Sequence, residues 1–163
     1  MFKHILVTLD GSAYSERVLS YVADLAALVE ARVTLLTVVP DSTFPSEAKA
    51  AGGDAPSADV YRTYLDRHAT MLRAAGVADV STALRAGVAA RVIVQAAREL
   101  AADLVAMSTQ GVSADSDEGL GGVASKVLMA APCPVFMVRI VRPEPPRTPA
   151  EATWQAEGGA NVG

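Results

Sequence analysis

Short apolar runs recur along the chain, separated by longer segments in which apolar residues return every three or four positions. The run at 33–39 is apolar apart from Thr34 and Thr37 and lacks strict alternation. Such a run is typical of a strand that is covered on both faces in a parallel sheet. The apolar runs predict five strands, at residues 5–9, 33–39, 80–84, 103–108 and 135–140.

The segments between these runs predict helices. Val18, Val22, Leu25 or Ala26, and Val29 recur every three or four residues, so they form one apolar stripe, with Ser12 or Ser15 available as the N-cap. A second helix is expected over 59–75, with Val60, Tyr64, Leu65 or His68, and Leu72 facing inward and Gly76 as its left-handed cap. Further stripes at 92–100 and at Val123, Val127 and Ala130 or Ala131 predict two more helices, the last of which Pro132 ends.

Strands that alternate with helices of this length predict an α/β fold with one doubly wound, five-stranded parallel sheet. The chain has 163 residues, which suits one domain. Segment 41–57 is rich in Pro, Gly, Ser and Ala without apolar periodicity and is expected to be a loop. Residues 141–163 contain four prolines and three glycines after the last strand, and we expect a domain at 1–140 followed by a disordered tail.

Charge and composition exclude several classes of function. The formal net charge is −4, which disfavours general nucleic-acid binding because such proteins carry a basic patch. One cysteine cannot form an internal disulfide, and His4 and His68 do not have a metal-ligand spacing. No export signal or membrane-spanning run is visible, so the expected location is the cytoplasm.

Candidate chemistry lies at the carboxyl ends of the predicted strands, where open parallel sheets place their ligand sites. Three segments reach this edge: 8–12, 38–40, and 108–111 continuing to 121–122. The glycines of the third segment allow backbone amides to approach a phosphate, and the helix that follows adds the positive end of its dipole. The alternative is that these glycines only satisfy loop geometry, and the residues alone leave both readings open.

The opening ILVTLDGS, the phrase APCPV at 131–135, the order of elements and the spaced glycines together resemble the universal stress protein family over residues 1–140. Family members that bind ATP carry Gly-x2-Gly-x9-Gly-Ser/Thr, and Gly111 and Gly121 keep the nine-residue spacing. The resemblance implies a Rossmann-like fold of the adenine-nucleotide alpha-hydrolase type. It also implies a stress-response protein that uses ATP or AMP as a conformational switch, with a homodimer paired through the last strand and a protein partner that the sequence does not identify.

The resemblance also implies the positions of the binding residues. Asp10 and the backbone of Val38 would lie beside adenine and ribose, and Ser108 and Gly111 near the ribose and α-phosphate. The start of the last helix would face the outer phosphates. The complete set of candidate binding residues is Thr8, Leu9, Asp10, Val38, Ser108, Gly111, Gly121, Gly122 and Val123.

Two departures from the family pattern leave the function open. Ser108 replaces the first glycine, and Gly122 replaces the final hydroxyl residue, which removes one hydrogen bond to a phosphate. Three carboxylates, Asp115, Asp117 and Glu118, would repel phosphates unless Mg²⁺ lies between them. The alternative is therefore a universal stress protein that binds no nucleotide and acts through dimerisation and partner contacts. A slow ATPase is a third reading, but no nucleophile elbow or P-loop is present.

Three single residues have structural explanations. Cys133 lies between two prolines, where a small buried residue fits, and no cation adjacent in sequence lowers its pKa. His4 is expected to be a surface or strand-edge residue. Trp154 falls in the predicted tail, where it either docks on a surface or is incidental.

Overall fold

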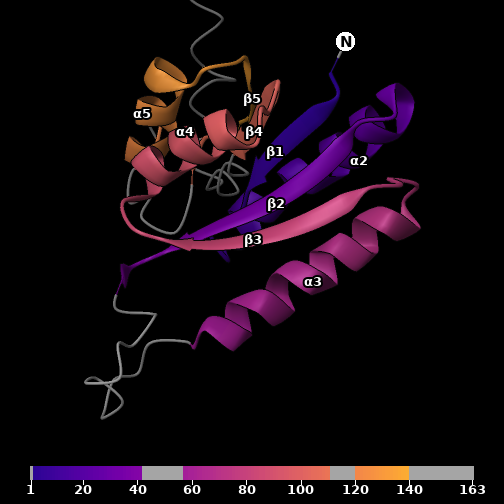
Figure 1. Cartoon of the computed structure of the whole chain (residues 1–163), viewed down its shortest axis with the longest axis horizontal. Coiled ribbons are helices and arrows are strands. Elements are labelled where there is room, and N and C mark those ends of the chain that lie inside the picture. The colour runs from indigo at the N-terminus through magenta and orange to yellow at the C-terminus, as the bar shows by residue number, and fades with distance from the viewer. Residues whose placement is uncertain (1, 42–56, 111–119, 140–163) are drawn as a thin grey trace, which may run out of the picture.

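The computed structural model of the chain describes residues 2–41, 57–110 and 120–139. Figure 1 shows a central twisted sheet with helices on both faces. The elements in chain order are β1 (His4–Thr8), α1 (Ala13–Glu16), α2 (Val18–Val29), β2 (Arg32–Val39), α3 (Ala58–Ala74), β3 (Val80–Ala86), α4 (Ala89–Glu99), β4 (Leu104–Ser108), α5 (Gly122–Ala130) and β5 (Val135–Val138).

All the strands in the sheet are parallel, and their order is β3-β2-β1-β4-β5. Val7 of the central strand pairs with Leu35 of β2 on one side and with Ala106 of β4 on the other. The chain therefore winds outward first through β2 and β3 and then through β4 and β5. This arrangement confirms the predicted doubly wound sheet, and it places a topological switch point between β1 and β4.

Alternate residues of the strands point into two hydrophobic layers. Ile5 and Val7 pack with α2 and α3, whereas Leu6 packs on the opposite face with α4 and α5. The strand residues Ile5, Leu6 and Val7 are all fully buried. Full burial on both faces explains why the central run in the sequence shows no apolar–polar alternation.

The local signals at two turns are confirmed. Ser12 is the N-cap of α1, and its side chain accepts a hydrogen bond of 3.1 Å from the backbone N–H of Ser15. Gly76 follows α3 with a φ of +99°, the left-handed conformation that glycine adopts without strain. The predicted first helix is preceded by the short α1, and the two meet at Arg17.

Several helix and strand details of the prediction were wrong. Val60 and Val123 are 56% and 41% exposed, so neither belongs to the inward stripe of its helix. In α5, Ala124 and Val127 are the buried residues instead. β3 continues to Ala86, beyond the predicted 80–84, because it pairs with β2 along its whole length. Residues 42–56 and 140–163, which include most of the predicted loop, Ile140 and the predicted tail, lie outside the described residues.

The sequence predicted a surface or strand-edge position for His4. The residue is the first of the central strand, but with 4% exposure it is buried and not at the surface. Its Nδ1 donates to the carbonyl of Leu100 at 2.9 Å, and its Nε2 lies 2.7 Å from the hydroxyl of Thr34. Thr34 in turn lies 2.9 Å from the hydroxyl of Ser81. The ring therefore ties β1 to the end of α4 and, through Thr34, to β2 and β3. Burial lowers the pKa of His4, which keeps the imidazole neutral.

We expect the burial of His4 to make the protein less stable in mild acid. The unfolded chain takes up the proton at a higher pH than the folded protein, so the free energy of unfolding falls as the pH drops below about 6.5. His4→Gln should lower the free energy of unfolding by about 1–2 kcal/mol at pH 8, because buried hydrogen bonds are lost, and should reduce this acid sensitivity. Urea unfolding between pH 5 and 8 measures both effects. His68→Gln is the control that retains the contribution of His4, and an unchanged slope in His4→Gln would contradict the assignment.

The sequence predicted a small buried residue at position 133, and the structure places Cys133 in a half-buried position. Burial raises the pKa of its thiol, with a smaller contribution from the charge of Asp103. A thiol in this state has little thiolate and is a poor nucleophile, consistent with a structural role for Cys133.

Among the described residues, no helix has the length and apolar character needed to cross a membrane.

Candidate functional site

A cavity of about 620 Å³ opens at the carboxyl edge of the sheet. It extends across the ends of β2, β1 and β4, which are neighbouring strands, so it lies over the topological switch point. Helix residues close it on both sides. Its lining residues are Thr8, Leu9, Asp10, Ser15, Leu36, Val38, Val39, Pro40, Tyr61, Ala89, Ile93, Met107, Ser108, Thr109, Gln110, Gly121, Gly122, Val123, Ala124 and Lys126.

The loop after β1 holds Asp10 in a defined orientation. The Oδ1 atom of Asp10 accepts hydrogen bonds from the backbone N–H of Ser12 at 3.0 Å and from its hydroxyl at 2.6 Å. The N–H of Asp10 donates to the hydroxyl of Ser15 at 3.2 Å, and Ser15 is buried. The sequence LDGS therefore folds so that the carboxylate is fixed at the mouth of the cavity by the cap of the next helix.

The segment that enters α5 supplies backbone donors to the opposite end of the cavity. The N–H of Gly121 donates to the carbonyl of Thr109 at 2.8 Å, which fixes the start of the helix against the end of β4. The N–H of Ser125 donates to the carbonyl of Gly121 at 2.9 Å, the bond that closes the first helical turn. The N–H groups of Gly122, Val123 and Ala124 precede that bond, and such first-turn N–H groups attract an anion.

Ser108 lines the cavity, but its hydroxyl makes a hydrogen bond within the loop that follows β4. The side chain is buried, and its hydroxyl donates a short hydrogen bond to the carbonyl of Gln110. A hydroxyl that donates within the loop does not donate to a phosphate. Ser108 therefore lies at the cavity, where the resemblance had placed it, and its hydroxyl holds the turn after β4.

The charges at the cavity are well separated along the sheet edge. Among the described lining residues, Asp10 and Lys126 are the charged ones. Asp10 follows the central strand, whereas Lys126 lies one turn inside α5 on its exposed side. The β2 side of the cavity is lined by apolar side chains, including Val38, Val39 and Ile93. The cavity thus has an apolar half and a half that offers backbone donors and a cation.

The structure brings together most of the residues that the sequence analysis selected. Thr8, Leu9, Asp10, Val38, Ser108, Gly121, Gly122 and Val123 all line this cavity. Gly111 and the acidic residues Asp115, Asp117 and Glu118 lie outside the described residues. Within the described ranges, no group of three or more His, Cys, Asp or Glu side chains is arranged to hold a metal ion.

The sequence analysis missed the cavity residues that come from helices. Tyr61 lies in the first turn of α3, and Ala89 and Ile93 lie in α4. Each of these helices starts at the carboxyl edge, because each follows the carboxyl end of a parallel strand. This rule could have identified the first turns of α3 and α4 as lining segments, although it could not have identified which side chain points inward.

A family model and the similar curated proteins identify the same family for this chain. The model of the universal stress protein family matches residues 1–139. A universal stress protein of Synechocystis is 31% identical over 138 residues, which cover 85% of this chain and 86% of the relative. A putative universal stress protein of Staphylococcus haemolyticus is 29% identical over 140 residues, which cover 85% of each chain.

Solved structures share the fold at lower sequence identity. A universal stress protein from Lactobacillus plantarum is similar with a TM-score of 0.72 and 21% identity, covering 85% of this chain and 98% of that one. A universal stress protein in complex with cAMP has a TM-score of 0.67 and 23% identity, covering 86% and 98%. One from Archaeoglobus fulgidus in complex with dAMP has a TM-score of 0.60 and 20% identity, covering 84% and 97%.

Proposed function

Because this chain belongs to the universal stress protein family, we propose that it is a cytoplasmic stress-response protein that binds an adenine nucleotide, ATP or AMP, as a conformational switch. The observation that carries the proposal is the cavity itself, which joins an apolar half to the amide end of a helix at the switch point of the sheet. Two structurally similar family members were solved with cAMP and dAMP bound, which supports an adenine nucleotide as the ligand class.

The arrangement of the cavity suggests how a nucleotide would lie in it. Adenine would occupy the apolar half beside Val38 and Ile93, and the ribose hydroxyls would donate to the carboxylate of Asp10. The phosphates would face the N–H groups of Gly122 and Val123 and the ammonium of Lys126. Neighbouring strands are about 4.8 Å apart, so the ends of β2 and β4 are separated by roughly 10 Å, comparable with the distance from a purine base to its phosphates.

Mg²⁺ would enter this site with the phosphates rather than as a resident ion. It keeps several water ligands and uses few carboxylates when phosphates coordinate it. A bound nucleotide would change the surface around the cavity mouth, and a protein partner would read that change. The described cavity residues offer an apolar surface, backbone donors, one carboxylate and one cation, which suit binding, so binding without dedicated catalysis is the function we propose.

The test is to identify small molecules released from the purified protein and then to titrate ATP, ADP and AMP by calorimetry, with and without Mg²⁺. Binding at micromolar concentration or tighter supports the switch. No binding up to millimolar nucleotide would overturn it. The second candidate function, a dimer that acts without nucleotide, would then be favoured, because all four residues of the edge strand β5 are only partly buried in the single chain.

Gly122→Ser is expected to tighten ATP binding about ten-fold. A Cβ atom at position 122 would meet no other atom within 4 Å, so there is room for the side chain. Its hydroxyl could donate to a phosphate, and a hydrogen bond to a charged group contributes about 1.5–3 kcal/mol. Calorimetry with ATP measures the effect, and Gly122→Ala is the matched control that adds the Cβ atom without the hydroxyl. Equal affinities in the two variants would show that no phosphate lies beside this residue.

A further inference from the structure

A second groove, of about 490 Å³, lies between α4 and α5, and Lys126 lines both this groove and the cavity at the sheet edge. The groove is rich in cations. Arg91 and Arg98 are seven residues apart on α4 and so lie on one side of that helix, and Lys126 faces them from α5. The residues lining the groove are Ala90, Arg91, Val94, Gln95, Arg98, Lys126 and Ala130.

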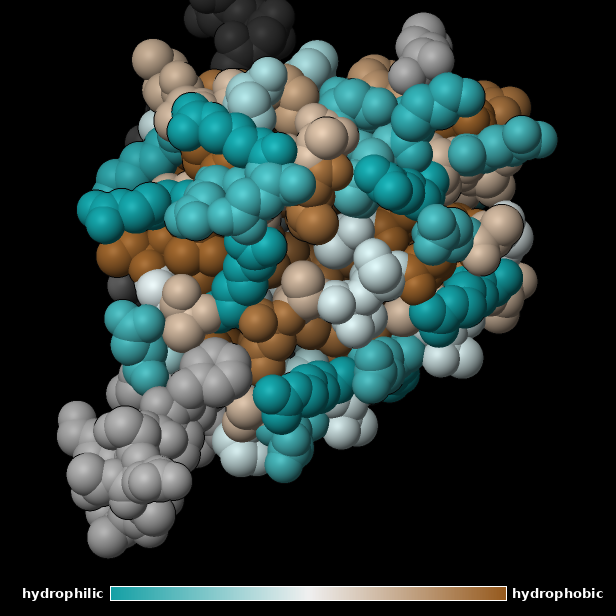
Figure 2. All heavy atoms as spheres, in the orientation of Figure 1, coloured by the Kyte–Doolittle hydropathy of each residue, from teal (hydrophilic) through white to brown (hydrophobic). Residues whose placement is uncertain are grey.

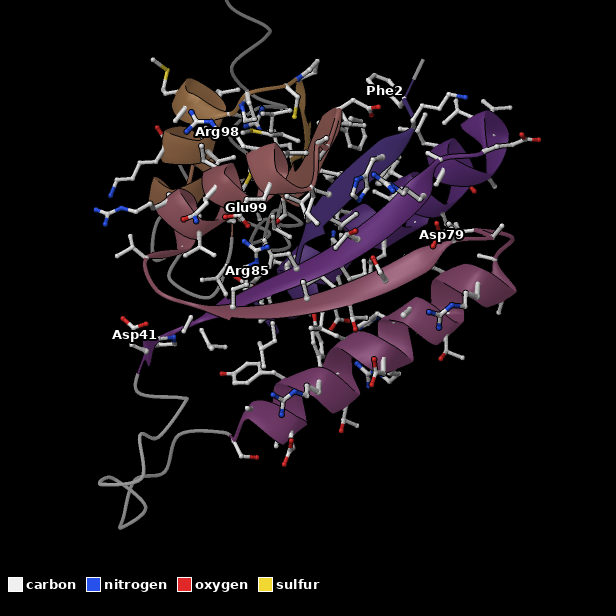
Figure 3. The ribbon with its side chains drawn as sticks, in the orientation of Figure 1. Phe2, Asp41, Asp79, Arg85, Arg98 and Glu99 are labelled. Carbon is white, nitrogen blue, oxygen red and sulfur yellow. The ribbon has the colours of Figure 1, made fainter. Side chains whose placement is uncertain are left out.

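The acidic residue nearest to this groove along α4 is held by other partners. Glu99 accepts a hydrogen bond of 2.6 Å from Arg85 of β3 and one of 2.7 Å from Gln95. Figure 3 shows Glu99 and Arg85 together on the β3 side of α4, and Arg98 on the side of α5. The sequence of α5, GVASKVLMA, contains no acidic residue.

The three groove cations therefore have no carboxylate partner among the described residues. They are concentrated in one place although the whole chain has a formal net charge of −4. Such a local excess of positive charge attracts an anionic segment. Figure 2 shows hydrophilic residues over α4 and α5 with hydrophobic surface between them.

The floor of the groove is apolar and built from small side chains. Ala90 and Val94 are each 8% exposed, and Ala130 borders the groove from α5. Small side chains between long cationic ones leave space for a flat ring, and arginine binds favourably over an aromatic face. The groove thus suits an aromatic residue that has acidic neighbours.

A segment with this chemistry occurs in the same chain. Residues 151–157 read EATWQAE and place Trp154, the single tryptophan of the protein, midway between Glu151 and Glu157. No lysine or arginine occurs from residue 148 to residue 163. Charge and aromatic content are therefore both complementary to the groove.

The position at which the described chain ends makes this contact reachable. Arg139 directly follows β5, and Val135 and Met137 of that strand pack in the same hydrophobic layer as α4 and α5. The eleven residues from 140 to 150 can span up to about 36 Å, whereas α4 is only about 16 Å long. A tether of this length keeps the local concentration of the segment near the millimolar range.

We propose that residues 151–157 dock in the groove between α4 and α5 of the same chain, with Trp154 on its apolar floor and the two glutamates beside Arg91 and Arg98. This inference does not depend on nucleotide binding. Its failure would leave the carboxyl-edge site untouched.

Fluorescence of the single tryptophan tests the proposal in the intact protein. In the wild-type protein we expect blue-shifted emission and weak quenching by acrylamide, because Trp154 is covered. The double variant Arg91→Glu/Arg98→Glu should lower the ratio of docked to free segment roughly ten-fold, since two ion pairs are replaced by repulsion. Its emission should shift to the red, and quenching should approach that of a peptide with the sequence of residues 147–160.

Matched variants separate a specific contact from a change in net charge. Arg17→Glu/Arg62→Glu changes the charge by the same amount at exposed positions outside the groove, and it should leave the emission unchanged. Adding Glu151→Arg/Glu157→Arg to the groove variant should restore the blue-shifted emission, because the charges are exchanged. Circular dichroism checks that each variant folds.

Three results would overturn the proposal. Wild-type quenching equal to that of the peptide would show that Trp154 is not covered. Equal emission in the groove variant and the control variant would show that it is covered elsewhere. A blue shift that grows with protein concentration would mean that the segment docks on a second copy, not on its own chain.

Discussion

Gly121→Val is expected to weaken the binding of ATP and AMP by at least about 100-fold while the protein stays folded. A Cβ atom at position 121 would lie 3.1 Å from the carbonyl oxygen of Thr109, which is the acceptor of the Gly121 N–H. The larger valine side chain would push the first turn of α5 away from the end of β4. A 100-fold loss corresponds to about 2.7 kcal/mol, roughly the contribution of one or two hydrogen bonds to a charged phosphate.

Calorimetry with both nucleotides measures this loss, and urea unfolding verifies the fold. The φ of Gly121 is −56°, a value that valine can adopt, so the expected defect arises from the contact and not from backbone strain. Gly122→Ala is the control one residue later, where a Cβ atom meets nothing within 4 Å, and it should bind nucleotide within about three-fold of the wild type. A folded Gly121→Val protein with unchanged affinity would remove the first turn of α5 from the site.

Met137→Pro is expected to convert the proposed homodimer into a monomer. β5 lies at the edge of the sheet, and the carbonyls of Pro134 and Val138 accept hydrogen bonds of 3.0 Å from the N–H groups of Val105 in β4 and of Thr109 just after it. Since the backbone groups of successive strand residues point to opposite sides, those of Met137 face away from β4. Proline there removes a donor from the free edge, where a second copy would pair, and leaves the bonds to β4 in place.

Light scattering during size-exclusion chromatography measures the outcome. The dimer dissociation constant should rise at least about 100-fold, because the backbone ladder at a symmetric edge contact is interrupted twice. Met137 also packs in the layer of α4 and α5, so Met137→Ala is the control that removes the side chain but keeps the N–H. A wild-type protein that is monomeric at all concentrations, or a proline variant that dimerises as well as Met137→Ala, would exclude pairing through this edge.

Much of the candidate site could be predicted because it depends on local signals. The short apolar run before LDGS makes the central strand and ends it at Asp10, and parallel strands bring their carboxyl ends to one edge. The glycines at 121 and 122 are found at that edge for the same reason. Backbone geometry and topology, rather than side-chain contacts, decide these positions.

Other features could not be predicted from the sequence, because they depend on which side chains meet after folding. His4 looks like a polar residue near a terminus, yet its ring is buried because Thr34 and the carbonyl of Leu100 provide partners for both nitrogens. The partners of His4 lie 30 and 96 residues away in the sequence, and partners so distant leave no periodic signal in either segment.

The sequence by itself determined the alternation of strands and helices, the parallel sheet and the edge at which the site lies. It did so because the local spacing of apolar residues reflects strand burial and helix amphipathicity. Only the tertiary structure decided that Tyr61 and Ile93 close the cavity, and that Arg91, Arg98 and Lys126 share one groove. Those arrangements depend on the rotation and packing of helices against the sheet, which no single segment encodes.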